Sequence, residues 1–391
     1  MKQNSKPIYL DHAATTSIST AVLEAMYPYL TESYGNPSSM YSIAQEARQA
    51  LDNARQICAN VLGSRSSEVV FTSGGTESDN SAIMGAALAL KANGNHIVTT
   101  SIEHHAVLYA CELLETLGFE VTYLPVSSKG LVDLDALQSS IKSTTTVVSI
   151  MYANNEIGSI QPISEISEII KAKQTQYGTK IAFHSDAVQA AGYLDLDTNK
   201  LGVDLLSLSA HKFEGPKGVG LLFIRRNTPF IPTQVGGSQE RDRRAGTENV
   251  AGIVGMSTAL RLAVENRTQN FEYVSAIRDH LINSIFERID NCQLNGDYEN
   301  RLPNNVNFSF KGVEGEPILL GLDLLGIAAS SGSACSAASL EPSHVLLALG
   351  LSNDLARSSL RLSLGPSNTL EEINSVVDKL QPLIRKLRTL S

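Results

Sequence analysis

The regular alternation of short apolar runs with helical patterns between residues 69 and 208 constrains the fold more than any other feature of this sequence. The apolar runs predict strands at residues 69–71, 97–99, 121–124, 147–151, 181–183 and 205–208. Segments with helical periodicity lie between them, up to about residue 90 and at 106–117, 135–141 and 163–177. Because strands that alternate with helices form a mostly parallel sheet covered on both faces, we expect an α/β fold.

The length of 391 residues exceeds that of one ordinary domain, so we expect a large domain and a smaller one. We assign residues 17–265 to the large domain, and residues 1–16 together with 266–391 to the small domain. In the C-terminal part the patterns predict one long helical stretch from 250 to about 289, a strand at 305–310, and helices at 317–325 and 371–387.

Charge and composition exclude several classes of function. A net charge of −9, from 31 basic and 40 acidic residues, argues against broad affinity for nucleic acid. No apolar run approaches the ~20 residues of a membrane span, and the first residues lack the apolar segment of a signal peptide. We therefore expect a cytoplasmic protein. The four cysteines show no spacing typical of a zinc site or a disulfide framework.

A polar cluster follows each of five predicted strands, and in α/β folds ligands bind at the carboxyl ends of strands. We therefore expect these clusters to converge on one crevice. They lie at residues 72–76, 103–105, 152–156, 184–189 and 209–212.

Lys212 is the first candidate for chemistry, in the string DLLSLSAHKFEGPKGVG at residues 204–220. A lysine amine in a sheltered site at a strand end can form a Schiff base with an aldehyde cofactor, and pyridoxal phosphate is the obvious one. By itself the stretch also fits an ordinary surface lysine. The glycine-rich turn at residues 72–78 predicts a cradle for phosphate, with Thr76 as an extra donor, although an ordinary capped helix start remains an alternative.

Further side chains suit the same cofactor. Asp186 follows a strand and can pair with a pyridinium nitrogen, while Gln189 and Asn155 can donate to a phenolic oxygen. His104 can stack on a ring or shuttle protons. Each, taken singly, also fits a turn or capping residue.

The C-terminal part contributes a thiol and a guanidinium. Cys335 lies among small residues at 329–339, which predicts a mobile loop and an accessible, reactive thiol. Cys58 and Cys111 lie in apolar helical surroundings and are expected to be buried.

Arg361 alternates with apolar residues. It can bind a substrate carboxylate, or it can be a surface arginine on a strand. The glycine- and arginine-rich segment 236–247 predicts an anion-handling, subunit-contact or solvated loop.

Taken together, these motifs resemble the cysteine desulfurases of NifS/IscS type, within the class V aminotransferase-like enzymes that use pyridoxal phosphate. The resemblance covers nearly the whole chain, and the long cysteine loop resembles the first of the two desulfurase groups. It rests on YLDHAATT at 9–16, FTSGGTESDN at 71–80, EH at 103–104, NNEIG at 154–158, DAVQ at 186–189, SAHK at 209–212, RAGTEN at 244–249, SGSAC at 331–335 and SLEPSH at 339–344.

The resemblance implies a pyridoxal phosphate-dependent transferase fold of type I, with a seven-stranded, mostly parallel sheet sandwiched by helices and a smaller α+β domain. It implies that Lys212 carries the cofactor, that His104 stacks on its ring, and that Asp186 faces the ring nitrogen. It further implies that Asn155 and Gln189 bond the phenolic oxygen of the cofactor. Its phosphate would be bound by Gly75, Thr76, Ser209 and His211. In a homodimer, Thr247 would complete the phosphate site of the neighbouring subunit.

The implied reaction is the conversion of L-cysteine to L-alanine. Arg361 with Asn155 would bind the substrate carboxylate, and Cys335 would take the sulfur as a persulfide and pass it to acceptors such as an iron–sulfur scaffold. Members devoted to cluster assembly often carry a further tail that engages the scaffold, whereas this sequence ends at Ser391, so the acceptor stays open. The alternatives are a carbon–sulfur or selenocysteine lyase on the same scaffold and a catalytically silent sulfur-trafficking adaptor.

Overall fold

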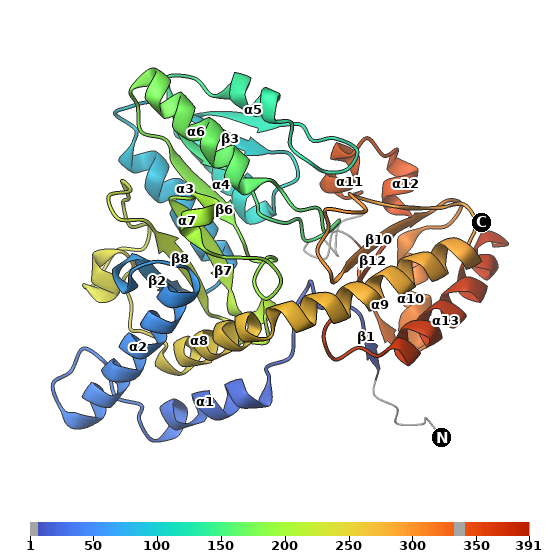
Figure 1. The fold of residues 1–391 in the computed structure, drawn as a ribbon, viewed down its shortest axis with the longest axis horizontal. Helices are drawn as coiled ribbons and strands as arrows, with labels where there is room; N and C mark the ends of the chain where they lie inside the picture. Colours follow the sequence, from blue (N-terminus) through green and yellow to red (C-terminus); the bar gives the residue numbers. More distant parts are fainter. Residues whose placement is uncertain (1–6, 332–340, 391) are drawn as a thin grey trace.

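The computed structural model describes residues 7–331 and 341–390. Figure 1 shows two bodies side by side, a larger one around a long sheet and a smaller one that holds the C-terminus. In the described part of the chain the large body contains the helices α1 Thr20–Thr31, α2 Ser42–Val61, α3 Gly75–Ala89, α4 His105–Thr116, α5 Leu134–Ser140, α6 Ile163–Tyr177, α7 Thr198–Leu201 and α8 Val250–Glu265, with 3-10 turns η1 Ser66–Glu68, η2 Ala210–Lys212 and η3 Gln239–Asp242.

The central sheet of the described chain has seven strands in the order β2-β8-β7-β6-β5-β3-β4. Only β8 runs antiparallel to its neighbours, so the predicted mostly parallel sheet is confirmed. Their bounds are β2 Val69–Thr72, β3 His96–Thr100, β4 Glu120–Leu124, β5 Thr145–Ser149, β6 Ala182–Asp186, β7 Leu205–Ser209 and β8 Gly220–Ile224.

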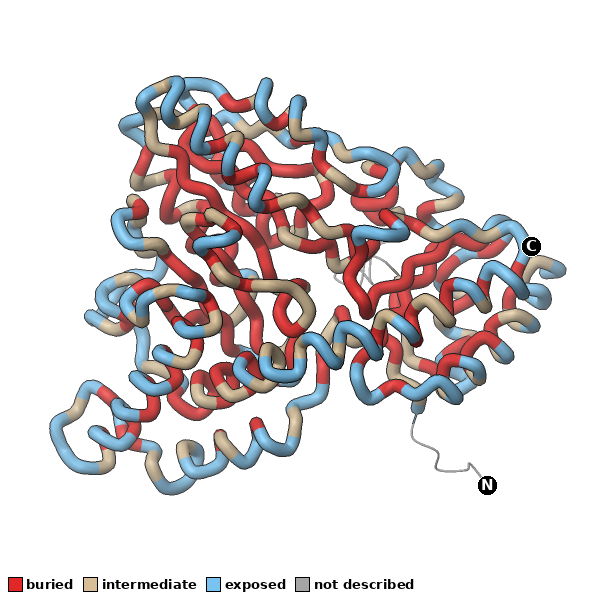
Figure 2. Tube along the Cα trace, in the orientation of Figure 1, coloured by how far each residue is buried: buried red, intermediate tan, exposed pale blue. Residues whose placement is uncertain are grey.

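Helices cover both faces of this sheet, which is why its strands are continuous apolar runs. Successive residues of a strand point to opposite faces, so Leu205 packs with α3 and α4 whereas Leu206 packs with α2, α6 and α8. Figure 2 shows the resulting buried strands inside an exposed shell of helices. Cys58 and Cys111 are buried in these two layers, as predicted.

The smaller body is built around an antiparallel sheet in the order β12-β10-β9. Helices α9, α10 and α13 pack on it and share one apolar core with Leu10 from the N-terminal segment. The bounds are β1 Ile8–Tyr9, α9 Arg267–Arg288, β9 Cys292–Leu294, β10 Asn305–Phe310, α10 Gly315–Leu324, β11 Ile327–Ala328, α11 His344–Ala348, α12 Asn353–Arg357, β12 Ser359–Ser363 and α13 Leu370–Arg388.

The helical stretch predicted from 250 to about 289 is wrong in one respect, because it consists of two helices. Helix α8 ends at Glu265, and α9 begins at Arg267 after Asn266. The Asn266 side chain donates to the carbonyl of Leu262, which completes the end of α8. In Figure 1, α8 lies under the large sheet and α9 runs on into the smaller body. Within residues 7–331 and 341–390, no helix is both long and apolar enough to cross a membrane.

Candidate active site

A cavity of about 380 Å³ opens where the polar segments after β2, β3, β5, β6 and β7 meet. We call it the central cavity. This convergence is confirmed, because the carboxyl ends of parallel strands lie at the same edge of the sheet. Of the twelve site residues predicted from sequence, ten line the central cavity, namely Gly75, Thr76, His104, Asn155, Asp186, Gln189, Ser209, His211, Lys212 and Arg361.

Lys212 reaches the central cavity because β7 ends at Ser209 and the turn η2 carries the chain across the sheet edge. Its ammonium nitrogen donates to the carbonyl oxygens of Ala13 and Ala14 at 2.6 Å and 2.8 Å. Gln189 Nε2 also donates to Ala13 O, at 3.0 Å. The N-terminal segment after β1 is therefore fastened against the lysine, and it forms part of the cavity wall.

Asp186 is the last residue of β6 and is buried in the cavity wall. Its Oδ1 accepts a hydrogen bond from the backbone N–H of Val188 at 2.9 Å. Burial raises the pKa of Asp186 to about 6, while the Val188 N–H and the Lys212 charge act in the opposite direction. The carboxyl group therefore has two contacts that favour its ionised form.

His104 is fixed in orientation by its place at the start of α4. Its Nδ1 accepts a hydrogen bond from the backbone N–H of Ala106 at 3.1 Å, so the side chain caps the helix. Burial, followed by the charge of Lys212, lowers the pKa of His104 to about 4. A neutral, flat ring is thus held on the cavity wall at neutral pH, as stacking on another ring requires.

The turn between β2 and α3 lies close to the backbone of β8. A Cβ on Gly220 of β8 would lie 2.6 Å from the carbonyl carbon of Gly74, so residue 220 must be glycine, and Gly74 has a φ of 157°, which suits glycine. Helix α3 begins at Gly75. The N–H groups of its first turn have no acceptor within the helix, so this end favours an anion.

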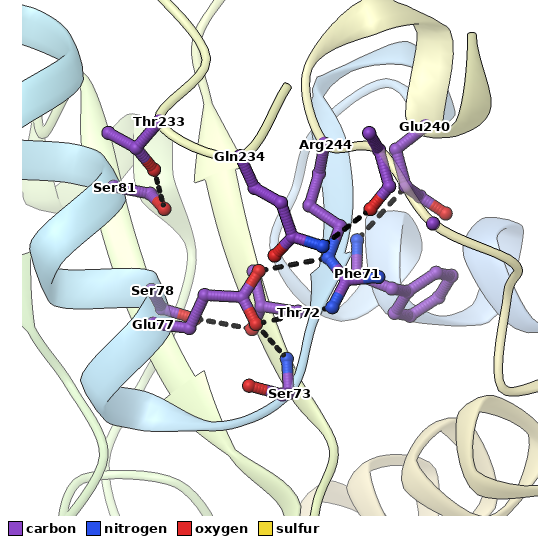
Figure 3. A network of polar contacts seen from close by, with 12 residues as sticks. Phe71, Thr72, Ser73, Glu77, Ser78, Ser81, Thr233, Gln234, Glu240 and Arg244 are labelled. Carbon is purple, nitrogen blue, oxygen red and sulfur yellow. Dashed lines mark hydrogen bonds and ion pairs between the residues drawn. The ribbon is translucent and has the colours of Figure 1, made fainter. Parts of the chain in front are cut away.

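Side chains hold this glycine turn in place, as Figure 3 shows. Glu77 accepts from the backbone N–H of Ser73 at 2.7 Å and from Arg244 Nε at 2.9 Å. The hydroxyls of Thr72 and Ser78 lie 2.7 Å apart. Of the alternatives for segment 236–247, a wholly solvated loop is therefore wrong, because Arg244 packs on Glu77 with about a fifth of its side chain exposed.

Arg361 comes from β12 and is 1% exposed. Its guanidinium contacts Asp11 Oδ1 at 2.9 Å and donates to the carbonyl of Asn155 at 3.0 Å. The Nε is buried and has no hydrogen-bond partner among the described residues. Since a buried, unpartnered donor is costly, the position fits an arginine that completes its bonds with an anion. The alternative of a surface arginine is wrong.

Several residues of this site were given no role from the sequence, although Glu103 lies in the predicted polar cluster 103–105. Asp79 and Glu103 line the central cavity as buried carboxyl groups, and His344 lines it from α11. Asp11 holds Arg361 from a segment 350 residues away. Two signals were available, since Asp79 follows the glycine turn by one helical turn and Glu103 directly precedes His104. For Asp11, only the folded chain reveals the partner.

Two predicted site residues lie elsewhere. Cys335 falls outside the described residues. Thr247 is exposed and lines a separate small cavity of about 110 Å³ together with Thr72 and Ser73. Within one chain Thr247 therefore does not line the central cavity.

The donor set of the central cavity matches the groups of pyridoxal phosphate. One space is lined by an amine that suits the aldehyde, a carboxylate that suits the ring nitrogen and a neutral imidazole that suits the ring face. The free end of α3 and the hydroxyl of Ser209 suit the phosphate. A Cβ on Gly75 would come within 3.0 Å of Val188 Cγ2, so the space beside the turn exists because no side chain fills it.

Comparison with known proteins gives consistent results. The sequence matches the family described as Aminotransferase class-V over residues 8–376. A cysteine desulfurase IscS of Dictyoglomus turgidum is 52% identical over 386 residues, which cover 99% of this chain and 96% of the relative. A cysteine desulfurase IscS of Methanosarcina thermophila is 51% identical, with coverage of 99% and 94%.

Solved structures are similar over the same length. A NifS-like protein superposes with a TM-score of 0.91 at 37% identity, covering 97% of this chain and 100% of the other. The structure of SspA in complex with cysteine gives a TM-score of 0.80 at 36% identity, with coverage of 93% and 100%. The chain therefore belongs to the class-V aminotransferase family and, within it, groups with relatives named cysteine desulfurases.

Proposed function

We propose that this protein is a pyridoxal phosphate-dependent cysteine desulfurase. It converts L-cysteine to L-alanine and transfers the sulfur to Cys335 as a persulfide. The observation that carries the proposal is the meeting of ten predicted site residues around one cavity, in a chain half identical to named cysteine desulfurases. Similarity to the cysteine complex of SspA supports L-cysteine as the substrate.

The residues that would hold the cofactor come from five strand ends. Lys212 would bind its aldehyde carbon, Asp186 its ring nitrogen, and His104 its ring face. Asn155 and Gln189 would bond the phenolic oxygen, and Gly75, Thr76, Ser209 and His211 the phosphate. When bound, the group supplies an electron sink for bonds at the substrate α carbon. At the end of α3, the network around Glu77 keeps the phosphate turn in place.

Arg361 and Lys212 would orient the substrate and move its proton. Arg361 offers its guanidinium to the carboxylate of cysteine, while Asp11 and the Asn155 carbonyl hold it in one orientation. Lys212 accepts the proton from the α carbon as a general base. Its amine is held near the Ala13 and Ala14 carbonyls, within the same cavity as Arg361.

Cys335 would act as the nucleophile towards sulfur. Its thiolate attacks the substrate sulfur, a sulfur–sulfur bond forms, and the carbon–sulfur bond breaks. The electron pair of the broken bond stays with the carbon skeleton, which takes up a proton and leaves as alanine. The persulfide then passes to acceptor proteins, for which we propose a scaffold for iron–sulfur clusters. A cytoplasmic location stays a prediction from the sequence.

The test is to incubate the pure protein with L-cysteine and to measure alanine together with the mass added to the Cys335 peptide. We expect one equivalent of alanine per turnover and the mass of one sulfur atom on that peptide. Cys335→Ala should abolish alanine formation and keep the visible absorbance of the cofactor. Cys292→Ala, a half-buried cysteine of β9, is the matched control and should behave as wild type.

The same measurements separate the alternatives. A carbon–sulfur or selenocysteine lyase would turn over in Cys335→Ala at the normal rate. A catalytically silent adaptor would show no visible band of bound cofactor, or a band that persists in Lys212→Ala. Either result contradicts the proposal.

We propose further that two subunits form the site together, with Thr247 of each subunit completing the phosphate site of the other. This is supported by the exposed position of Thr247, away from its own central cavity. In mixed dimers, a Thr247→Ala subunit paired with a Lys212→Ala subunit should regain one working site. Restoration would fail if Thr247 acted within its own chain, because the subunit that retains Lys212 would lack Thr247.

A further inference from the structure

Four buried carboxyl groups line the central cavity, and three of them, Asp79, Glu103 and Asp186, act on one another electrostatically. Asp79 of α3 is 1% exposed, Glu103 after β3 is 0% exposed, and Asp186 of β6 is 7% exposed. The fourth, Glu156, is 4% exposed and accepts a hydrogen bond from the Ser343 hydroxyl. The proposed function uses only Asp186. Because ionised carboxylates in a buried site repel each other and lack solvation, three neighbouring groups cannot all carry a charge.

Asp79 has one contact that favours a charge on it, a hydrogen bond from the Ser207 hydroxyl, which lowers its pKa less than burial and the charge of Asp186 raise it. Its Oδ1 accepts no hydrogen bond from the described residues and lies 3.6 Å from Nε2 of His184. That imidazole is fully buried, and burial lowers its pKa to about 3, so it brings no positive charge. The two ring nitrogens of His184 are bonded to the hydroxyls of Ser149 and Ser207, at 2.9 Å and 3.0 Å.

Asp186, in contrast, has contacts that favour its charged form, namely the Val188 N–H and the Lys212 ammonium. Glu103 is intermediate, since its Oε1 accepts from Thr100 and from the backbone of Met151, while its Oε2 has no partner among the described residues. The groups that face Asp79 from the packed strands are therefore Asp186 and His184 from β6, Glu103 after β3, and Ser207 from β7.

We propose that Asp79 is a positioning residue that remains a neutral carboxylic acid, so that Asp186 alone presents a negative charge to the ring nitrogen of the cofactor. Burial, and then the charge of Asp186, raises the pKa of Asp79 well above its ordinary range, which agrees with this assignment. A second carboxylate at this point would oppose ionisation of Asp186 and weaken its pairing with the ring. This inference rests on the proposed function for the role of Asp186.

The first experiment measures the proton on Asp79 directly, in cofactor-free protein. Infrared spectra at pH 7 should contain the carbonyl stretch of a buried carboxylic acid, which shifts on exchange into heavy water. Asp79→Asn should remove one such band, and Glu103→Gln should remove a different one. If Asp79→Asn leaves every carboxylic acid band in place, the inference is wrong. The carboxylic acid bands of the wild-type protein can also be followed as the pH is raised. If they disappear before pH 7 is reached, Asp79 is ionised at neutral pH and the proposal is wrong.

The second experiment measures how the cofactor binds. Because asparagine is neutral and close in shape to a protonated aspartate, Asp79→Asn should change the dissociation constant of pyridoxal phosphate by less than about threefold. Asp186→Asn should weaken binding by more than about tenfold. Equal losses in the two variants would show that Asp79 is ionised and contradict the inference.

The two proposals fail in different ways. If Lys212→Ala keeps the visible band of the cofactor, the proposed function is wrong, whatever the infrared spectrum shows. If the band depends on Lys212 but cofactor-free protein has no carboxylic acid signal from Asp79, only the inference on Asp79 is wrong.

Discussion

Lys212 contributes to the walls of two cavities that differ in their content of ionisable groups. The central cavity holds the buried carboxyl groups of Asp79, Glu103, Glu156 and Asp186 and the imidazole of His104. The second cavity, of about 260 Å³, is lined by alanines, a leucine, three asparagines, and the ionisable side chains of His12, Tyr193 and Glu214. The central cavity therefore holds more ionisable groups than the second cavity does.

The difference shows in which part of the molecule ionisable groups are buried despite the cost in free energy. Burying an ionisable group costs free energy unless another group compensates it, so such groups concentrate at sites of chemistry. In the central cavity, burial raises the pKa of Glu103 to about 8 and lowers that of His104 to about 4. If the contrast is meaningful, changes in the central cavity should alter activity far more than changes in the second cavity.

The largest effect is expected for Lys212→Ala. Without the amine, the protein loses both the attachment of the cofactor and the base at the α carbon, so alanine formation should fall by at least about 10³-fold. The visible band of bound cofactor should also disappear. Lys91→Ala, an exposed lysine at the end of α3, is the control and should retain both. Residual activity within tenfold of wild type would contradict the assignment.

Arg361→Gln should have the next largest effect. A charge-assisted hydrogen bond to a carboxylate contributes roughly 1.5–3 kcal/mol, so kcat/KM for cysteine should fall about 10- to 100-fold. The loss should appear mainly in KM, while cofactor binding persists. Steady-state kinetics with cysteine and an absorbance titration with pyridoxal phosphate measure the two effects. An unchanged KM would place the substrate carboxylate elsewhere.

Glu77→Gln tests the turn at the edge of the central cavity. Glu77 holds Ser73 and Arg244, and these bonds keep its pKa below the usual range although burial opposes them. Hydrogen bonds to a charged group contribute about 1.5–3 kcal/mol. Glutamine keeps the shape but loses the charge, so these bonds weaken and the turn is held less firmly. We therefore expect cofactor affinity to fall about three- to tenfold. Equilibrium dialysis at several phosphate concentrations measures this loss. No loss would mean that the turn is rigid without Glu77.

Glu103→Gln tests the cost of burial through the pH dependence of stability. The pKa of Glu103 is about 8 in the folded chain and about 4.5 when exposed, so the folded state binds the extra proton between these values. Its contribution to the free energy of unfolding is therefore full below pH 4.5 and is lost as pH rises towards 8.

Urea denaturation of cofactor-free protein at pH 5.5, 7 and 8.5 measures this dependence. Wild type should lose stability towards pH 8.5 more steeply than Glu103→Gln, because the glutamine cannot ionise. Parallel curves for the two proteins would show that Glu103 does not titrate in this range. Glu316→Gln on the first turn of α10 is the exposed control.

The smallest effect is expected in the second cavity. Ala263→Leu adds volume to the wall of the second cavity without removing an ionisable group. Activity should stay within about twofold, and the free energy of unfolding should change by less than about 1 kcal/mol, because the added side chain fills open space. A large loss of activity would show that this cavity also takes part in the reaction and would end the contrast.

Much of the site could be predicted because local patterns carry it. Three features are visible as short motifs, namely the glycine turn at Gly74 and Gly75, the strand that ends before Lys212 and the aspartate at the end of β6. The direction of parallel strands then brings their ends together. The break between α8 and α9 was not predicted, because Asn266 interrupts a continuous helical pattern only through its own capping bond.

The sequence by itself determined the alternation of strands and helices, the mostly parallel sheet, and the identity of the lysine and its neighbours, because these depend on periodicity and on motifs a few residues long. Tertiary structure alone decided that Asp11 holds Arg361 and that Asp79 faces Asp186 without a counter-charge. The physical reason is burial. Desolvation and neighbouring charges depend on residues distant in sequence, so the protonation of each group follows only once the chain is folded.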